Sequence, residues 1–332
     1  MQNEEQERKM STINTPYDDV FRTLLNDCSS LIVPVINEVF GEHYTGKEKV
    51  VFSPNEHFLN RQDGEEEEKI TDTSFQIQGK EAKKYHLECQ SSADNSMLVR
   101  FFEYDTQIAL DQGELEGNVL TVTFPHSAVL FLRSRKSTPE KMKIRMLTPG
   151  GGQEYDIPVM KTQNYTLDEI LEKNLLFLIP FYIFTYEKNF KEYEENQELL
   201  EDLKAEYGKI RKHLEDLSEQ RVISEYTKCT IMDMAGKVLE KIAENFGEVR
   251  EGVKSVMGGK ILEYEAKAIR SEGLREGRNV GLREGRNEGR SEGRLQMLFD
   301  LVYDGVLPVA DAAVKAKLTE EAFRQKMQTY RK

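Results

Sequence analysis

The sequence lacks a hydrophobic run long enough to span a bilayer. Its longest apolar run, LLFLIPFYIF at residues 175–184, is about half the length of a transmembrane helix and contains a proline. The first ten residues, MQNEEQERKM, are acidic and polar, and so do not resemble a signal peptide. We therefore expect a cytoplasmic protein that does not enter a membrane.

Cysteine is scarce and scattered. Cys28, Cys89 and Cys229 lie far apart in the chain and show no CxxC spacing. This pattern indicates neither a disulfide framework nor a zinc site, and it fits a reducing cytosol. The 5 histidines also lack the helical spacing of metal ligands.

Positive charge is in deficit. The 332 residues include 46 Lys and Arg against 59 Asp and Glu, which gives a net charge of −13. Such a balance argues against nucleic-acid binding over the whole surface. Only residues 261–332 are net positive, with 14 basic against 12 acidic side chains, so any electrostatic attraction to DNA should be local.

Hydrophobic periodicity predicts an α/β core followed by an extended all-α region. In chain order we expect a helix at 16–40 kinked or split at Pro34, a strand at 49–54, a solvated loop at 63–69, a hairpin at 69–92, a helix at 95–113, one or two buried strands at 118–134, a second hairpin at 143–160, and helices from 166 to 257.

The stretch KITDTSFQIQGKEAKKYHLECQSS at residues 69–92 carries a candidate site on the first hairpin. Residues two apart in a strand share a face, so His86, Glu88 and Gln90 form a polar face opposite an apolar one. A hairpin symmetrical about Glu81 would place Asp72 opposite Gln90 and diagonal to Glu88. Diagonal partners lie roughly 7–8 Å apart, which lets two carboxylates hold one cation.

This polar face has two interpretations. Oxygen ligands of this kind suit Mg²⁺, which takes one or two carboxylates and can activate water at a phosphodiester. Alternatively, Asp72 and Glu88 are only part of the wet face of a β-hairpin. Spacing alone does not decide between them.

Five motifs in a fixed order carry a family resemblance. They are TPYDDVFRTLL with Asp18, Phe21 and Arg22; the strand with Asp72; HLECQSS with Glu88, Gln90 and Ser91; MLVRFFEYDTQI with Arg100 and Tyr104; and TFPHSAVLFLRS. Over roughly residues 12–190 the chain resembles the PD-(D/E)XK nuclease-family transposases, or recombination-promoting nucleases.

The resemblance implies a restriction-endonuclease-like mixed sheet flanked by helices, and Mg²⁺-dependent cleavage of DNA, with Mn²⁺ as a possible substitute. Asp72 and Glu88 would bind the metal, with the backbone carbonyl of Cys89 as a further ligand. Asp18 could reach the site as another ligand, although an acid there also satisfies the helix dipole. RNA as the substrate stays open.

Gln90 departs from the wider superfamily, in which many nucleases have lysine at this position. A neutral amide orients water or donates a hydrogen bond, but it cannot offset negative charge at a phosphate. We therefore expect a slow enzyme or one that needs a second ion, and the alternative is a catalytically weak or inert scaffold. Arg100 and Tyr104 share a helix face, where they would contact phosphate or simply pack.

The most unusual stretch has glycine at every fourth position: Gly273, Gly277, Gly281, Gly285, Gly289 and Gly293. Such a stripe lets two helices approach closely, and its flanking Glu and Arg columns favour a parallel homodimer through residues 262–298. A flexible linker is the alternative.

The resemblance implies a nuclease-like domain at 12–190, and the sequence pattern beyond it suggests a helical region at 191–260 and the glycine repeat with a short helical cap at 261–332. Within the cap, AAVKAKLTEEAF could form a helix-turn-helix or a plain helical cap, and we expect Thr319 to cap a helix.

Overall fold

The structure is a computed structural model that describes residues 16–52, 56–60, 66–70, 74–91, 96–111, 113–257 and 293–330. Asp72 and most of the glycine repeat lie outside these residues, so the predictions for them stay predictions. Two compact units divide the chain, Met1–Arg270 and Ser271–Lys332.

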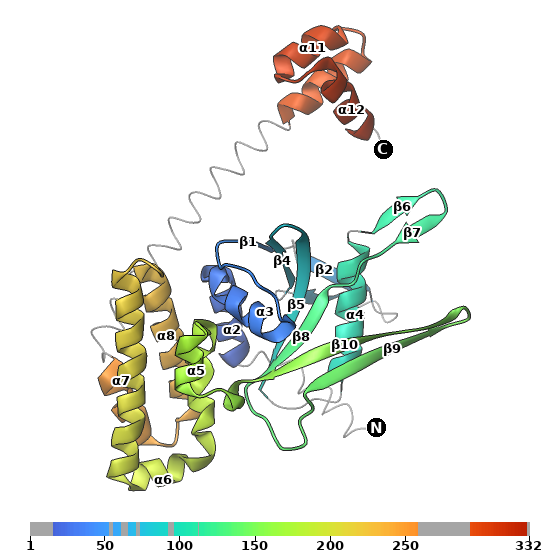
Figure 1. Cartoon of the computed structure of the whole chain (residues 1–332). Helices are drawn as coiled ribbons and strands as arrows, with labels where there is room; N and C mark the ends of the chain where they lie inside the picture. The colour runs from blue at the N-terminus through green and yellow to red at the C-terminus, as the bar shows by residue number, and fades with distance from the viewer. Residues whose placement is uncertain are drawn as a thin grey trace. The chain divides into compact units, whose positions relative to one another are not determined.

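A six-stranded mixed sheet forms the centre of the first unit (Figure 1). In spatial order its strands are β1 (Lys49–Phe52), β4 (Ser74–Gln78), β5 (Ala82–Gln90), β8 (His126–Phe131), β10 (Gly151–Lys161) and β9 (Lys141–Thr148). The pairs β5–β8 and β8–β10 are parallel, and the others are antiparallel. The predicted α/β class, with a helical C-terminal region, is confirmed at this level.

Helix α4 (Met97–Leu110) lies on one face of the sheet and connects the parallel strands β5 and β8. Its buried side chains recur at helical spacing, which explains why this segment forms an amphipathic helix. It packs on the sheet through a small core that includes Phe101, Val129 and Ile157. The short hairpin β6–β7 (Glu114–Glu116, Val119–Thr121) forms a separate two-stranded sheet, and the tip of the long hairpin β9–β10 projects beyond the other strands (Figure 1).

The main hydrophobic core lies on the opposite face. It joins Tyr85, Leu87 and Cys89 of β5 to α2 (Pro16–Asp27) and α3 (Ile32–Phe40). The apolar run predicted to be too short for a membrane span becomes the buried 3₁₀ helix η3 (Leu176–Thr185) of this core. Among the described helices, none is long and apolar enough to cross a membrane.

Helices follow the sheet as far as Met257, as the periodicity predicts. They are α5 (Leu167–Glu172), η3, η4 (Glu187–Asn189), α6 (Phe190–Glu195), α7 (Gln197–Glu219), α8 (Glu225–Ile242) and α9 (Gly247–Met257), preceded by η2 (Thr162–Asn164). Leu203 and Ile210 of α7 and Val238 of α8 belong to the same core as β5. The sheet and these helices are therefore stabilised together.

The second unit contains a helix at residues 293–303, α11 (Val309–Ala316) and α12 (Glu320–Tyr330). Phe299 and Phe323 meet in its small core, with ring centroids 4.9 Å apart. The Thr319 hydroxyl accepts a hydrogen bond from the Ala322 amide at 3.2 Å, which confirms the predicted cap.

Three predictions of local structure are corrected. The first helix is split, but at η1 (Ser29–Leu31) rather than at Pro34, which lies in the first turn of α3, where a proline is tolerated. The loop expected at 63–69 is largely strand β3 (Glu66–Ile70), paired with β2 (Glu56–Asn60). The first part of the apolar run at 118–134 is the exposed strand β7, and only β8 is buried.

Candidate functional site

The polar face of β5 is covered by α4 instead of being wet. His86 is fully buried beneath this helix, and its ring lies 5.1 Å from that of Phe101. The alternation of polar and apolar residues is as predicted, but its polar side faces a helix and not solvent. Glu88 and Gln90, nearer the end of the strand, are half-buried. The site therefore lies at the edge of the helix–sheet interface.

A hydrogen-bonded chain runs along this interface. The buried Asp105 carboxylate of α4 meets His86 Nδ1 at 2.7 Å, and His86 Nε2 faces Glu88 Oε1 at 3.2 Å. Ser127 Oγ of β8 donates to Asp105 Oδ1 at 2.6 Å, and Tyr155 OH of β10 donates to Asp105 Oδ2 at 3.0 Å. One helix and three strands thus contribute to a single buried polar cluster.

The surroundings of His86 and Glu88 favour the charged form of both side chains. Burial lowers the pKa of His86, but the hydrogen bonds to Asp105 and Glu88 outweigh it and raise that pKa to about 9. Burial raises the pKa of Glu88, but His86 and Arg100 outweigh this effect, and the net pKa falls. Glu88 is therefore an ionised carboxylate near neutral pH.

Three further predicted site residues lie around Glu88. Gln90 Nε2 is 3.4 Å from Glu88 Oε2. Arg100 of α4 acts on Glu88 electrostatically, and the Tyr104 ring stands edge-on to His86, with centroids 5.9 Å apart. Of the predicted Arg–Tyr pair, Arg100 therefore acts on the predicted carboxylate, whereas Tyr104 packs against the histidine beside it.

Cys89 faces the opposite side of the sheet, so its thiol and the His86 ring are separated, as the odd spacing predicts. Burial raises the pKa of this thiol, and the carboxylates of Asp18 and Glu88 raise it further. Asp18, on the first turn of α2, is half-buried. Both acids therefore act on the same end of β5.

The register of the hairpin differs from the predicted one. Ser74 pairs with His86 and Gln78 with Ala82, which centres the hairpin on Lys80, not on Glu81. The turn contains Gly79, Lys80 and Glu81, and the shift of centre changes the predicted cross-strand pairs by two residues. Asp72 lies outside the described residues.

The donor chemistry at Glu88 suits a hard divalent cation, because Mg²⁺ prefers charged oxygen ligands. Glu88 is ionised, whereas Asp18 acts on the neighbouring Cys89 thiol, which faces the other side of the sheet. Within the described ranges, no group of three or more His, Cys, Asp or Glu side chains is arranged to hold a metal ion.

The sequence did not predict the hydrogen bonds that connect Asp105 through His86 to Glu88. Asp105 lies on the buried stripe of α4 with Met97, Phe101 and Ile108. An acid among apolar residues at helical spacing rarely stays unpaired, and this was the available signal. His86 could be placed on the polar face but not assigned a partner, because Asp105 is 19 residues away.

A second feature was also missed, at the end of β8. Arg133 donates two hydrogen bonds to Glu187, at 2.6 and 2.7 Å, and its guanidinium lies 4.7 Å from the centre of the Phe184 ring. It also donates to the backbone oxygen of Ser91 at 3.4 Å. This pair therefore connects the segment after Gln90 to the helical region.

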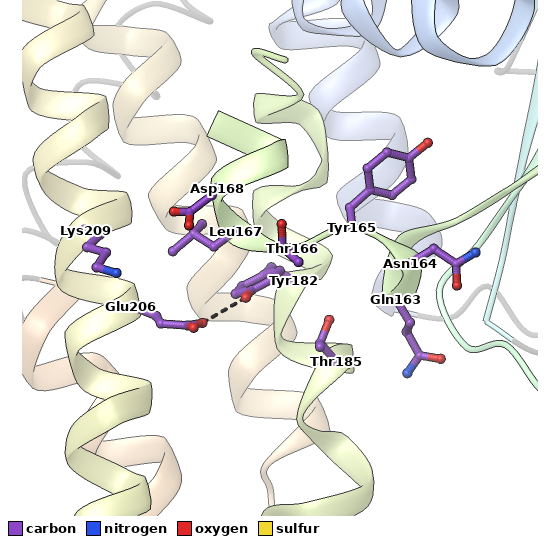
Figure 2. Close-up of a pocket in the computed structure, with 10 residues that line it drawn as sticks. All are labelled: Gln163, Asn164, Tyr165, Thr166, Leu167, Asp168, Tyr182, Thr185, Glu206 and Lys209. Carbon is purple, nitrogen blue, oxygen red and sulfur yellow. Dashed lines mark hydrogen bonds between the residues drawn. The ribbon is translucent and has the colours of Figure 1, made fainter. Parts of the chain in front are cut away.

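A polar pocket of about 250 Å³ opens elsewhere in the first unit (Figure 2). Glu206 of α7 points toward Tyr182 of η3, whose hydroxyl donates to it at 2.8 Å. The lining residues are Gln163, Asn164, Tyr165, Thr166, Leu167, Asp168, Tyr182, Thr185, Glu206 and Lys209. None of them is a predicted site residue, so this pocket is separate from the site at Glu88.

The resemblance to nuclease-family transposases rests on motifs in the sequence itself, since the comparisons with known proteins add nothing to it. Of the residues that carry it, Glu88, Gln90, Arg100 and Tyr104 gather at one end of the helix–sheet interface. No protein-family model, no curated protein and no solved structure matches the chain.

Proposed function

We propose that the chain is a Mg²⁺-dependent endodeoxyribonuclease of the transposase type, with a PD-(D/E)XK fold, that hydrolyses phosphodiester bonds in DNA. The observation that carries this proposal is the state of Glu88. Its carboxylate has a lowered pKa and is 19% exposed, yet it is anchored by a buried histidine. An ionised, oriented and accessible carboxylate is what a metal-dependent hydrolase requires.

Each residue has a distinct role in the proposal. Glu88 and Asp72 hold the cation, with the Cys89 carbonyl and Asp18 as further ligands. When bound, Mg²⁺ supplies positive charge against the phosphodiester and lowers the pKa of a bound water. Gln90, beside Glu88, orients water through its amide.

Arg100 and Tyr104 bind the substrate backbone in this proposal. The positive charge of Arg100 acts on Glu88, and in this proposal the same charge attracts a phosphate to the site. It partly replaces the lysine that Gln90 does not provide. The turnover should nevertheless be slow, because Gln90 carries no charge next to the scissile bond.

Nicking of supercoiled plasmid by the purified full chain tests this proposal. Mg²⁺ or Mn²⁺ should support nicking, and EDTA should abolish it. Asp72→Ala and Glu88→Gln should each reduce it to the EDTA background. Circular dichroism of each variant checks that it is folded, and equal nicking by the wild type and both variants would refute the proposal. Single-stranded RNA offered in parallel separates the two substrate classes.

A scaffold without nuclease activity is the second candidate. Both oxygens of Glu88 already lie within 3.4 Å of His86 or Gln90, which a purely structural carboxylate would also show. In either case the glycine repeat is proposed to form a parallel homodimer, and DNA is the expected partner. Sedimentation of the full chain tests the dimer, since a monomer at all concentrations would exclude it.

A further inference from the structure

Asp105 has more hydrogen-bond partners than it would need merely to attach α4 to the sheet. It is fully buried, and its two oxygens meet three partners from three strands: His86, Ser127 and Tyr155. Burying a carboxylate is costly unless its lone pairs are satisfied, and here they are. The position and orientation of Asp105 are therefore fixed by the fold.

His86 transmits this constraint to Glu88. Its ring has no exposed surface, and it is confined by Phe101 and Tyr104 on α4. One ring nitrogen meets Asp105 at 2.7 Å and the other meets Glu88 at 3.2 Å. A planar ring clamped between two carboxylates sets the direction of the more mobile one.

Of the three hydrogen-bonded side chains, only Glu88 is accessible to solvent. The side chains of Asp105 and His86 are 0% exposed, whereas that of Glu88 is 19% exposed. A polar cluster that served only to attach α4 to the sheet would not need to extend to an accessible carboxylate. Such second-layer hydrogen bonds orient carboxylates that ligate metals in proteins generally.

We infer that Asp105, acting through His86, is a positioning residue that holds the Glu88 carboxylate in its ligating orientation. This inference rests on the proposed function. Asp105 and His86 touch neither cation nor DNA, and their contribution is to keep Glu88 in one rotamer. Loss of such a partner typically weakens metal affinity by about 10- to 100-fold.

The test compares Asp105→Asn with Tyr155→Phe in the full-length chain. Asp105→Asn replaces the carboxylate with a neutral amide. Tyr155→Phe removes one hydroxyl from the same cluster but leaves the Asp105–His86–Glu88 contacts in place. Mn²⁺ affinity is measured by isothermal titration calorimetry, and the melting temperature is recorded without metal. Asp105→Asn should weaken Mn²⁺ binding by about 10- to 100-fold, whereas Tyr155→Phe should lower only the melting temperature.

A measurement on the wild type covers the case in which Asp105→Asn does not fold. The imidazole signals of the 5 histidines are followed by ¹H–¹⁵N NMR during a titration with Mg²⁺. The signals of His86, identified with His86→Gln, should move at the concentration that saturates the site. Those of His213, on α7, should not move.

Three results would overturn the inference. The first is Mn²⁺ affinity of Asp105→Asn equal to that of the wild type. The second is an equal loss of affinity in Tyr155→Phe, which would make the cluster structural only. The third is a His86 signal unmoved while the wild type binds metal. Wild-type protein that neither binds Mn²⁺ nor nicks plasmid would refute the proposed function itself, which distinguishes the two failures.

Discussion

The two faces of β5 come from alternate residues of one strand and behave in opposite ways. Tyr85, Leu87 and Cys89 face an apolar core shared by α2, α3 and the later helices. His86 and Glu88 face α4 and enter a polar chain that ends at partly exposed atoms. One face stabilises the fold, and the other carries the candidate chemistry. Alternation assigns the faces, but the covering helix decides their environment.

The largest expected effect is on the apolar face. Leu87→Ala removes a side chain that is 0% exposed, and should lower the free energy of unfolding by about 2–5 kcal/mol through lost burial and a residual cavity. Urea denaturation measures this change. Leu120→Ala on β7, where the leucine is 55% exposed, is the matched control and should change stability by less than about 0.5 kcal/mol. Equal losses at the two positions would refute the assignment of faces.

A smaller effect is expected at Arg133, in the segment that follows β8. Arg133→Met removes the paired hydrogen bonds to Glu187 and should cost about 1 kcal/mol, since partial exposure screens the charges. Arg133→Lys keeps the charge but not the paired geometry, and should lose part of this amount. The loss is measured by urea denaturation. If Arg133→Met is as stable as the wild type, the contact does not link β8 to the helical region.

The polar cluster shows how far sequence reasoning reaches at a site. Period-two alternation placed His86 and Glu88 on one face, and helical spacing placed Arg100 and Tyr104 on another surface that meets it. No local rule identifies Asp105 as the partner of His86, because that contact depends on how α4 crosses the sheet. Long-range pairing is therefore the part of the site that the sequence did not predict.

The secondary structure also divides into locally determined parts, which the sequence predicts, and parts that depend on long-range pairing, which it does not. Pro149 and its neighbouring glycines predicted the β9–β10 hairpin, because turn chemistry is local. The acidic run at 63–69 was assigned to a loop because its charges suggested solvation, yet Glu66–Ile70 pairs as β3. Strand pairing overrode a local preference there. The hairpin centre at Lys80 was likewise set by cross-strand pairing that local composition does not define.

The smallest expected effect lies where β5 leaves the core, at Lys83. Its ammonium pairs with Glu42 at 2.7 Å, which lowers the pKa of that carboxyl despite the opposing effect of burial. Because the folded pKa of Glu42 lies below its unfolded value, the pair stabilises the protein above about pH 4.5. This contribution is lost as the pH falls through the folded pKa.

Lys83→Met should therefore be slightly less stable than the wild type at pH 7, and the difference should disappear as the pH falls through the lowered pKa of Glu42. Thermal melts between pH 3 and 7 measure it, and the shift should be small compared with that of Leu87→Ala, since exposed pairs are screened. Lys80→Met, in the exposed turn of the same hairpin, controls for loss of a positive charge. If both variants depend on pH in the same way, net charge is the cause and not the pair, and the outer end of this face contributes nothing specific to the fold.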